Sequence, residues 1–189
     1  MSAVSTNAST HLFWVLSRGA GTTALILSSA SVGVGLVISG KLLKGSSPDR
    51  RAYHEVLSLA VMVAIAVHGL ALLGDSFLHP SLVDVTVPFI FSYKTFSTSL
   101  GIVAGWGMIA LGLSYYVRDR IGNERWKLIH RFTLLVWIAG LVHTFTEGTD
   151  RGQSWFVALI VLTTAPTLVL LVLRVSGGRF RSSPGVVAR

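Results

Sequence analysis

The chain has 189 residues, of which 51% are hydrophobic and only 13% are charged, and its mean hydropathy is +0.66. A soluble domain of this size needs far more polar surface, so the composition excludes a soluble globular protein. The 16 lysine and arginine residues outnumber the 8 aspartate and glutamate residues, but a membrane protein sorts such an excess to one side, so we expect no nucleic-acid partner. The chain has no cysteine, which excludes disulfides, iron–sulfur clusters, thiolate zinc sites and covalent c-type haem.

Five long uncharged runs separate the clusters of charge, at residues 19–40, 56–74, 95–117, 132–146 and 152–173. Four of them are long enough to cross a bilayer as a helix. The run at 132–146 is shorter than the others, but it becomes long enough if its helix begins near Trp126 and keeps Lys127, His130 and Arg131 at the interface. Backbone N–H and C=O groups have no water partner inside a bilayer, and a single apolar segment satisfies them only as a helix. These runs therefore predict an all-α integral membrane bundle of about five transmembrane helices.

Basic residues gather in three of the segments outside the apolar runs. These are Lys41, Lys44, Arg50 and Arg51 after the first run, Arg118, Arg120, Arg125 and Lys127 after the third, and Arg174, Arg179 and Arg181 after the fifth. The positive-inside rule places these segments in the cytoplasm, with the N-terminus outside and the C-terminus inside. We therefore expect a multi-pass protein of a cell membrane, of bacterial type, surrounded by the lipid bilayer.

The longest segment on the predicted outer side, residues 75–94, contains Pro80 and Pro88 among many apolar side chains. The prolines make it too broken for a span, but it is apolar enough to lie in the membrane interface. We expect it to cap the outer face of the bundle.

Four of the six histidines lie inside or at the ends of the predicted spans, and this placement is the most informative feature of the sequence. His54 and His68 belong to the second span, and His130 and His143 to the fourth. At 1.5 Å per residue, the spacings of 14 and 13 residues separate the two histidines of each helix by about 20 Å. Both spans run in the same direction, so His54 lies at the depth of His130 and His68 at the depth of His143.

Ionisable residues inside a membrane are costly and usually face a bundle interior where they serve a site. Neutral imidazoles on two facing helices can supply both axial ligands of a haem iron. The pattern therefore predicts two stacked haem b groups, with His54 and His130 as the inner iron ligands and His68 and His143 as the outer ones. The alternative is that these histidines only form hydrogen bonds between helices. His11 and His79 lie outside the spans and are expected to be exposed.

Helical phase agrees with this scheme only in part. On a regular α-helix, side chains 14 residues apart point within about 40° of the same direction around the axis, whereas side chains 13 residues apart differ by about 140°. The fourth span must therefore adjust, either by a π-bulge near Ala139 and Gly140 or by approaching the second haem from its other flank. Trp137 and Trp106 lie at mid-span and occupy either the gap between the haems or ordinary packing positions.

Haem propionates are anionic and need basic partners, and Arg131 and Arg18 are the preferred candidates. Other basic residues near the histidines in sequence are Arg50, Arg51, Arg125 and Lys127 at the inner level, and Lys94 and Arg151 at the outer level.

These residues resemble the ferric reductase-like transmembrane domain family, which includes ferric reductases and the membrane haem domain of NADPH oxidases. The resemblance rests on His54 with His68, on His130 with His143, and on the run Trp126-Lys-Leu-Ile-His130-Arg131. It covers residues 12–174 and implies one haem between the inner histidines and another between the outer ones. It leaves a polar segment at 1–11 and a predicted disordered cytoplasmic tail at 175–189. Cytochrome b of quinol-oxidising complexes also has histidines at the spacing of His54 and His68 and is a rival interpretation.

Larger members of that family carry a flavin and nicotinamide domain, but no glycine-rich dinucleotide motif follows the last span here, so we expect a separate electron donor. The sequence thus predicts a membrane oxidoreductase subunit, a di-haem cytochrome b that relays electrons from a flavoprotein reductase or quinol to an outer-face acceptor. No acid–base or nucleophilic catalytic residues are predicted. The alternative function is that of a small transporter or assembly factor whose histidines bind protons, copper or zinc.

Overall fold

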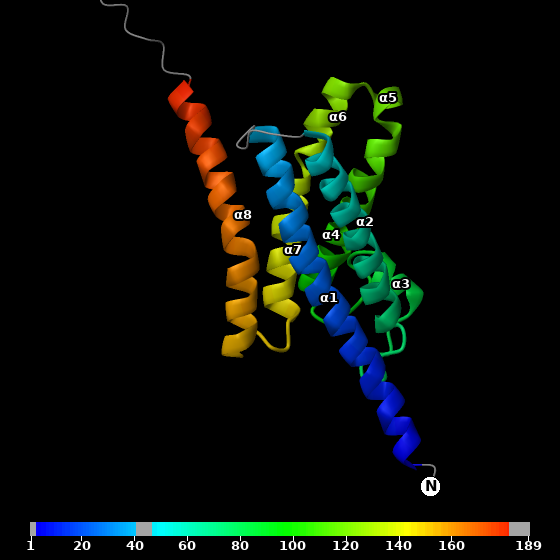
Figure 1. Ribbon diagram of the computed structural model, residues 1–189. Coiled ribbons are helices and arrows are strands. Elements are labelled where there is room, and N and C mark those ends of the chain that lie inside the picture. Colours follow the sequence, from blue (N-terminus) through cyan, green and yellow to red (C-terminus); the bar gives the residue numbers. More distant parts are fainter. Residues whose placement is uncertain (1–2, 41–46, 182–189) are drawn as a thin grey trace, which may run out of the picture.

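The computed structural model describes residues 3–40 and 47–181, which form a bundle of helices without a strand (Figure 1). This confirms the all-α class. The elements are α1 (Ala3–Gly40), α2 (Ser47–Leu72), α3 (Leu82–Thr86), α4 (Thr95–Leu113), the 3₁₀ turn η1 (Ser114–Val117), α5 (Arg118–Ile121), α6 (Asn123–His130), α7 (Thr133–Glu147) and α8 (Ser154–Arg181).

Five helical segments of the described chain are long and apolar enough to cross a membrane, as predicted. They are His11–Gly40, Pro48–Leu72, Thr95–Ile121, Asn123–Glu147 and Ser154–Ser176. The fourth combines α6 with α7 and includes Trp126, so the predicted extension of the short run is confirmed. The outward faces of these helices expose many large aliphatic side chains, such as Val63 and Leu162. Such faces suit lipid, which solvates apolar groups.

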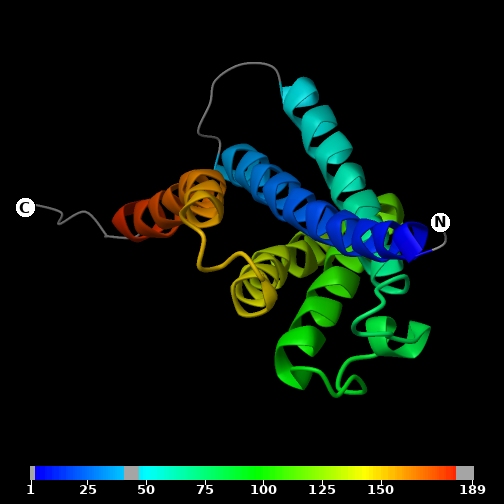
Figure 2. The same cartoon turned by 90° about the horizontal axis from the view of Figure 1, so that it is seen from below.

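Helix α1 lies at the centre of the bundle, between α2 on one side and α7 and α8 on the other (Figure 2). Its Ser29 is fully buried and joins three helices. Trp137 of α7 donates its Nε1–H to Ser29 Oγ at 3.1 Å, and Thr167 of α8 donates its hydroxyl to the Ser29 carbonyl at 2.8 Å. Trp137 is therefore a core residue, in contact with Val32 and Leu36, and it has the ordinary packing role.

Charge is divided between the two ends of the bundle. The basic helices α5 and α6 lie at the same end as the start of α2 and the end of α8, whereas the start of α1 lies at the opposite end (Figure 1). This agrees with three basic segments sharing one side; which side faces the cytoplasm stays a prediction. Helix α8 continues to Arg181, beyond the start of the predicted tail, because no proline interrupts it between Pro166 and Pro184. Residues 182–189 of that tail lie outside the described residues.

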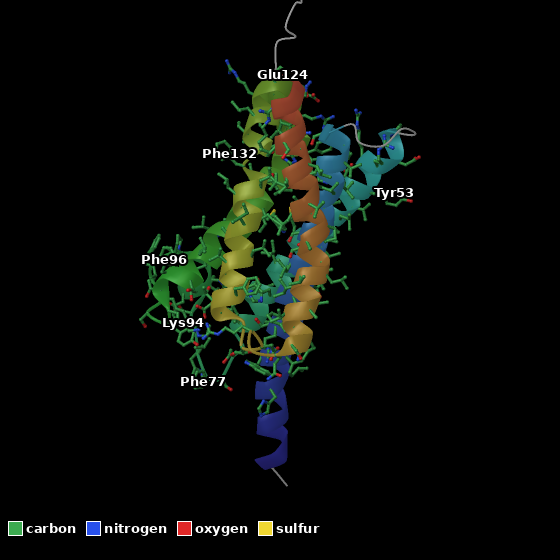
Figure 3. The ribbon with its side chains drawn as sticks, turned by 90° about the vertical axis from the view of Figure 1, so that its left-hand side faces the viewer. Tyr53, Phe77, Lys94, Phe96, Glu124 and Phe132 are labelled. Atoms are coloured by element: carbon green, nitrogen blue, oxygen red, sulfur yellow. The ribbon has the colours of Figure 1, made fainter. Side chains whose placement is uncertain are left out.

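The prediction that residues 75–94 cap the outer end of the bundle is corrected in part, because some of this segment lies along α4. Trp106 donates its indole N–H to the Thr86 carbonyl at 2.8 Å, and Phe89 donates its backbone N–H to Ser99 Oγ at 2.7 Å. Because Trp106 lies about 16 Å along the helix axis from the start of α4, the segment folds back beside α4. Most of its large apolar side chains are exposed, and Figure 3 shows Phe77 pointing away from the bundle.

Candidate functional site

The four span histidines come together as two pairs, one near each end of the bundle. The ring centroids of His54 and His130 are 6.1 Å apart with an interplanar angle of 90°. Those of His68 and His143 are 6.4 Å apart with an angle of 71°. The structure therefore makes the two pairs that the spacing predicts, each between α2 and the span formed by α6 and α7. Their role as iron ligands stays a prediction.

Helix α1 holds both histidines of α2 by the same arrangement. His68 Nδ1 lies 2.8 Å from the Ser17 carbonyl oxygen and 3.1 Å from its hydroxyl. His54 Nδ1 lies 3.0 Å from the Ser31 carbonyl oxygen and 3.2 Å from its hydroxyl. Because a carbonyl only accepts, Nδ1 must carry the proton in both rings, and Nε2 keeps a lone pair for a metal. This pattern is typical of metal-ligating histidines.

Glycines leave room for these rings. A Cβ on Gly21, one helical turn from Ser17, would lie 3.0 Å from His68 Nδ1, and a Cβ on Gly35, one turn from Ser31, would lie 3.3 Å from His54 Cε1. Ordinary carbon contacts are longer than these. Each histidine of α2 is thus seated in a cradle made by a serine and a glycine four residues apart on α1.

His143 has a cradle of the same kind on α4. Its Nδ1 donates to the Ser97 carbonyl at 2.9 Å. A Cβ on Gly101, four residues further along α4, would lie 2.5 Å from both His143 Nδ1 and Cε1. No side chain larger than hydrogen fits there unless the imidazole moves. His143 is therefore fixed in the same tautomer as the α2 histidines, with Nε2 available.

His130 is held differently from the other three. Its Nδ1 is buried and has no hydrogen-bond partner among the described residues. The indole of Trp126, one turn earlier on α6, stacks on the imidazole with centroids 5.0 Å apart and an interplanar angle of 25°. Trp126 in turn donates its Nε1–H to Ser114 Oγ at 3.1 Å. Aromatic stacking and this anchored indole help to orient the ring.

A break between α6 and α7 removes part of the phase mismatch of the fourth span. Arg131 donates its N–H to Leu128 O at 3.3 Å, and Phe132 donates to Ile129 O at 3.0 Å, so the chain tightens to i→i−3 bonds directly after His130. A 3₁₀ residue rotates about 120° and an α-helical one about 100°, so each tightened residue recovers about 20° of the rotation by which 13 residues fall short. A π-bulge at Ala139 and Gly140 is wrong, since both lie inside continuous α7.

The donor set of each pair fits haem iron better than a metal held by protein alone. No group of three or more His, Cys, Asp or Glu residues gathers within the described residues, whereas zinc sites usually have at least three protein ligands. Haem iron takes two axial ligands from the protein and the rest from its macrocycle. A metal–imidazole bond is about 2 Å long, so two imidazoles on opposite sides of one metal have centroids about 6 Å apart. Both observed separations agree with this value.

The comparison with known families decides the assignment. The profile described as "Ferric reductase like transmembrane component" matches residues 20–141, which is 122 of the 189 residues. The chain belongs to the ferric reductase-like transmembrane family. The matched range contains His54, His68 and His130 and ends two residues before His143. No curated protein and no solved structure matches the chain.

Membership gives this ferric reductase-like chain a general role in membrane electron transfer, and domains of the family generally bind haem. Together with the five apolar helices it also confirms a multi-pass membrane protein. The predicted resemblance to this family is thereby confirmed.

The two arginines that are predicted to bind haem propionates in this ferric reductase-like protein have different surroundings. Arg18 follows Ser17 on α1, forms an ion pair with Asp150 and lies with its guanidinium carbon 4.1 Å from the centroid of the Trp14 ring. Arg131 follows His130 at the helix break and is exposed. Each is thus next in sequence to a residue of one histidine site. A role in binding propionates stays a prediction for both.

The sequence analysis did not connect the histidines with the residues that hold them. The signal was present as Ser-x-Gly-x-Gly, which occurs at residues 17–21 and again at 31–35, and the two copies are as far apart in sequence as His54 and His68. Ser97, Gly101, Ser114 and Trp126 also belong to this set. His11 is exposed, as predicted, although it begins the first span. Trp106 binds Thr86, so its indole N–H serves the 75–94 segment.

Proposed function

We propose that this ferric reductase-like protein is a di-haem cytochrome b that relays electrons across the membrane. The observation that supports it best is the occurrence of two His–His pairs with centroids 6.1 and 6.4 Å apart. His54 and His130 would hold the haem at the basic end, and His68 and His143 the haem at the opposite end. Haem supplies the one-electron chemistry when bound.

The protein's own residues supply ligands, depth and orientation. Ser17, Ser31 and Ser97 keep three imidazoles in the Nδ1–H tautomer and so present Nε2 to the iron. The spacing between His54 and His68 sets the two levels about 21 Å apart along α2. The apolar outer faces of the helices exclude water from this path.

We further propose that the electron donor is a separate flavoprotein reductase or a quinol, and that the acceptor lies on the outer face. The chain then acts as the membrane subunit of an oxidoreductase. A transporter or assembly factor that binds copper or zinc is less well supported, because each described site offers two histidines and no third ligand.

Haem stoichiometry tests the proposal. Protein purified in detergent from haem-replete cells should contain two haem b groups per chain by the pyridine haemochrome assay, because there are two complete ligand pairs. His79→Ala, outside both pairs, is the matched control and should also contain two. A ratio near one would leave a single site, and a colourless protein that binds zinc or copper would favour the transporter.

A further inference from the structure

We propose that a groove between α2 and α8 binds one anionic phospholipid from the leaflet at the basic end of the bundle. The acyl chain would lie along α1, and the phosphate would contact the Arg50 guanidinium. The groove has a volume of about 640 Å³, which is within the range of ligand sites in proteins. This site is separate from electron transfer and does not depend on haem.

The groove exists because α2 and α8 both pack on α1, while neither packs closely on the other in the described chain. Figure 2 shows the two helices on different sides of α1. The floor on α1 includes the small residues Ala30 and Gly33, and the walls include Leu57 of α2 and Leu170 of α8. Because all three helices are long and apolar enough to be membrane spans, an acyl chain reaches this groove directly from the bilayer.

The length of the groove matches one leaflet. On α1 the lining residues run from Ile26 to Val37, a distance of about 16 Å along the helix axis. The hydrocarbon core of a bilayer is about 30 Å thick, so one leaflet provides about 15 Å. His54 of α2 meets Ser31, and α2 runs antiparallel to α1, so Arg50 lies toward the Val37 end. A chain that follows the groove therefore keeps its headgroup at the level of Arg50.

The polar groups that a headgroup can use lie at this same basic end. Thr163 and Thr167 also line the groove, but each donates its hydroxyl to a backbone carbonyl at 2.8 Å. Arg50 and Tyr53 are the other polar side chains of the lining. A guanidinium has five N–H donors, so Arg50 can bind a phosphate alongside its other interactions. A basic pocket between membrane helices is a typical site for an anionic headgroup.

The lining favours a phospholipid over a quinol. Oxidation of a quinol releases two protons with its two electrons, so a quinol site needs a side chain that accepts protons. No aspartate, glutamate or histidine of the described chain lines the groove. Arg50 instead supplies a fixed positive charge, which suits a phosphate and not an uncharged quinol.

Native mass spectrometry of the detergent-purified chain tests the site, with phosphatidylglycerol and phosphatidylcholine as the probes. One phosphatidylglycerol molecule should bind more tightly than phosphatidylcholine. Arg50→Gln removes charge-assisted hydrogen bonds to the phosphate and should weaken phosphatidylglycerol binding about tenfold. Arg51→Gln is the matched control and should change the affinity much less, because Arg51 is exposed and does not line the groove.

Ala30→Phe tests the apolar part of the groove without a change of charge. Ala30 is exposed on the groove floor, so the phenyl ring would occupy the space of the acyl chain and should weaken phosphatidylglycerol binding. Ala66→Phe is the control, because Ala66 is exposed on α2 outside the groove. Circular dichroism of the same samples separates loss of the site from loss of helix.

Equal weakening by Arg50→Gln and Arg51→Gln would indicate only a general attraction to the basic end and would overturn the inference. Equal affinity of the unmodified protein for the two phospholipids would also overturn it, as would unchanged binding in both Arg50→Gln and Ala30→Phe. Displacement of phosphatidylglycerol by decylubiquinone would assign the groove to a quinone instead. None of these measurements involves haem, so each failure is distinct from a failure of the di-haem function.

Discussion

The Ser17 carbonyl oxygen lies 2.8 Å from His68 Nδ1, and Ser31, the corresponding serine further along α1, makes the equivalent contact with His54 at 3.0 Å. The two serines are as far apart on α1 as the two histidines are on α2. Because α1 and α2 are antiparallel, these equal steps bring each serine to one histidine. One helix thus sets the tautomer and the depth of both α2 histidines, and the contacts of both histidines should tolerate little change in the register of α1.

The closest contact between a glycine position and a histidine ring gives the first prediction. Gly101→Ala places a Cβ 2.5 Å from the His143 ring, so the imidazole must move and the affinity for the haem at that level should fall about 10- to 100-fold. Gly69→Ala is the matched control, because a Cβ at Gly69 meets nothing within 4 Å. Haem loss to an excess of apomyoglobin measures both. Equal loss from the two variants would contradict the cradle.

The sequence was sufficient to predict five helices and the partners of the four histidines, because both follow from properties that survive without tertiary structure. Apolar length predicts a span, and residue spacing along a helix predicts depth. His54 and His68 needed only an unbroken α2. The pairing with His130 and His143 then needed only that two spans run in the same direction.

The cradles and the fold of residues 75–94 could not be predicted in this way. Ser17 and Gly21 acquire a role only through the register between α1 and α2, and a small residue in a membrane helix is equally consistent with ordinary packing. The break after His130 depends on i→i−3 bonds that no residue type there demands. The hydrogen bond from Trp106 to the Thr86 carbonyl is likewise a tertiary contact.

Orientation in the membrane gives a second prediction. Single cysteines at Arg120 and at Asp84 are specific labels, because the chain has no other cysteine. The excess of lysine and arginine at the α5 and α6 end predicts that position 84 reacts with an impermeant thiol reagent in intact cells and position 120 only after lysis. The reverse labelling pattern would contradict the predicted orientation, and the two haem levels would exchange their inner and outer assignments.

The short helix α3 gives a third prediction, which concerns the stability of this segment at low pH. Hydrogen bonds from the Ser81 hydroxyl and backbone N–H, at 2.7 and 2.8 Å, lower the pKa of the Asp84 carboxyl. A carboxylate with a lowered pKa stabilises the folded segment above its ordinary pKa of about 4, and this contribution is lost as the pH falls through the lower value.

The Trp106 indole N–H, which binds Thr86 at the end of α3, should report this loss as a shift of its NMR resonance below about pH 4. Asp84→Asn has no carboxyl to titrate and is the control. A resonance that moves equally in both proteins would show that another group is responsible.

The last prediction tests the pairing and the direction of electron flow together. His68→Ala removes one ligand of the outer pair and leaves His54 and His130 in place, 6.1 Å apart by their centroids. His68→Ala and His143→Ala should therefore lose the same haem and share one residual spectrum, while His54→Ala and His130→Ala share another. With a donor on the side of α5 and α6, the outer-pair variants should still reduce their remaining haem but pass no electrons to an external acceptor, because the gap of about 21 Å is no longer bridged. The inner-pair variants should be slow to reduce at all. If His68→Ala instead matched His130→Ala, the two pairs would be assigned wrongly, and the relay would have to be redrawn with α2 and α7 contributing their ligands at different depths.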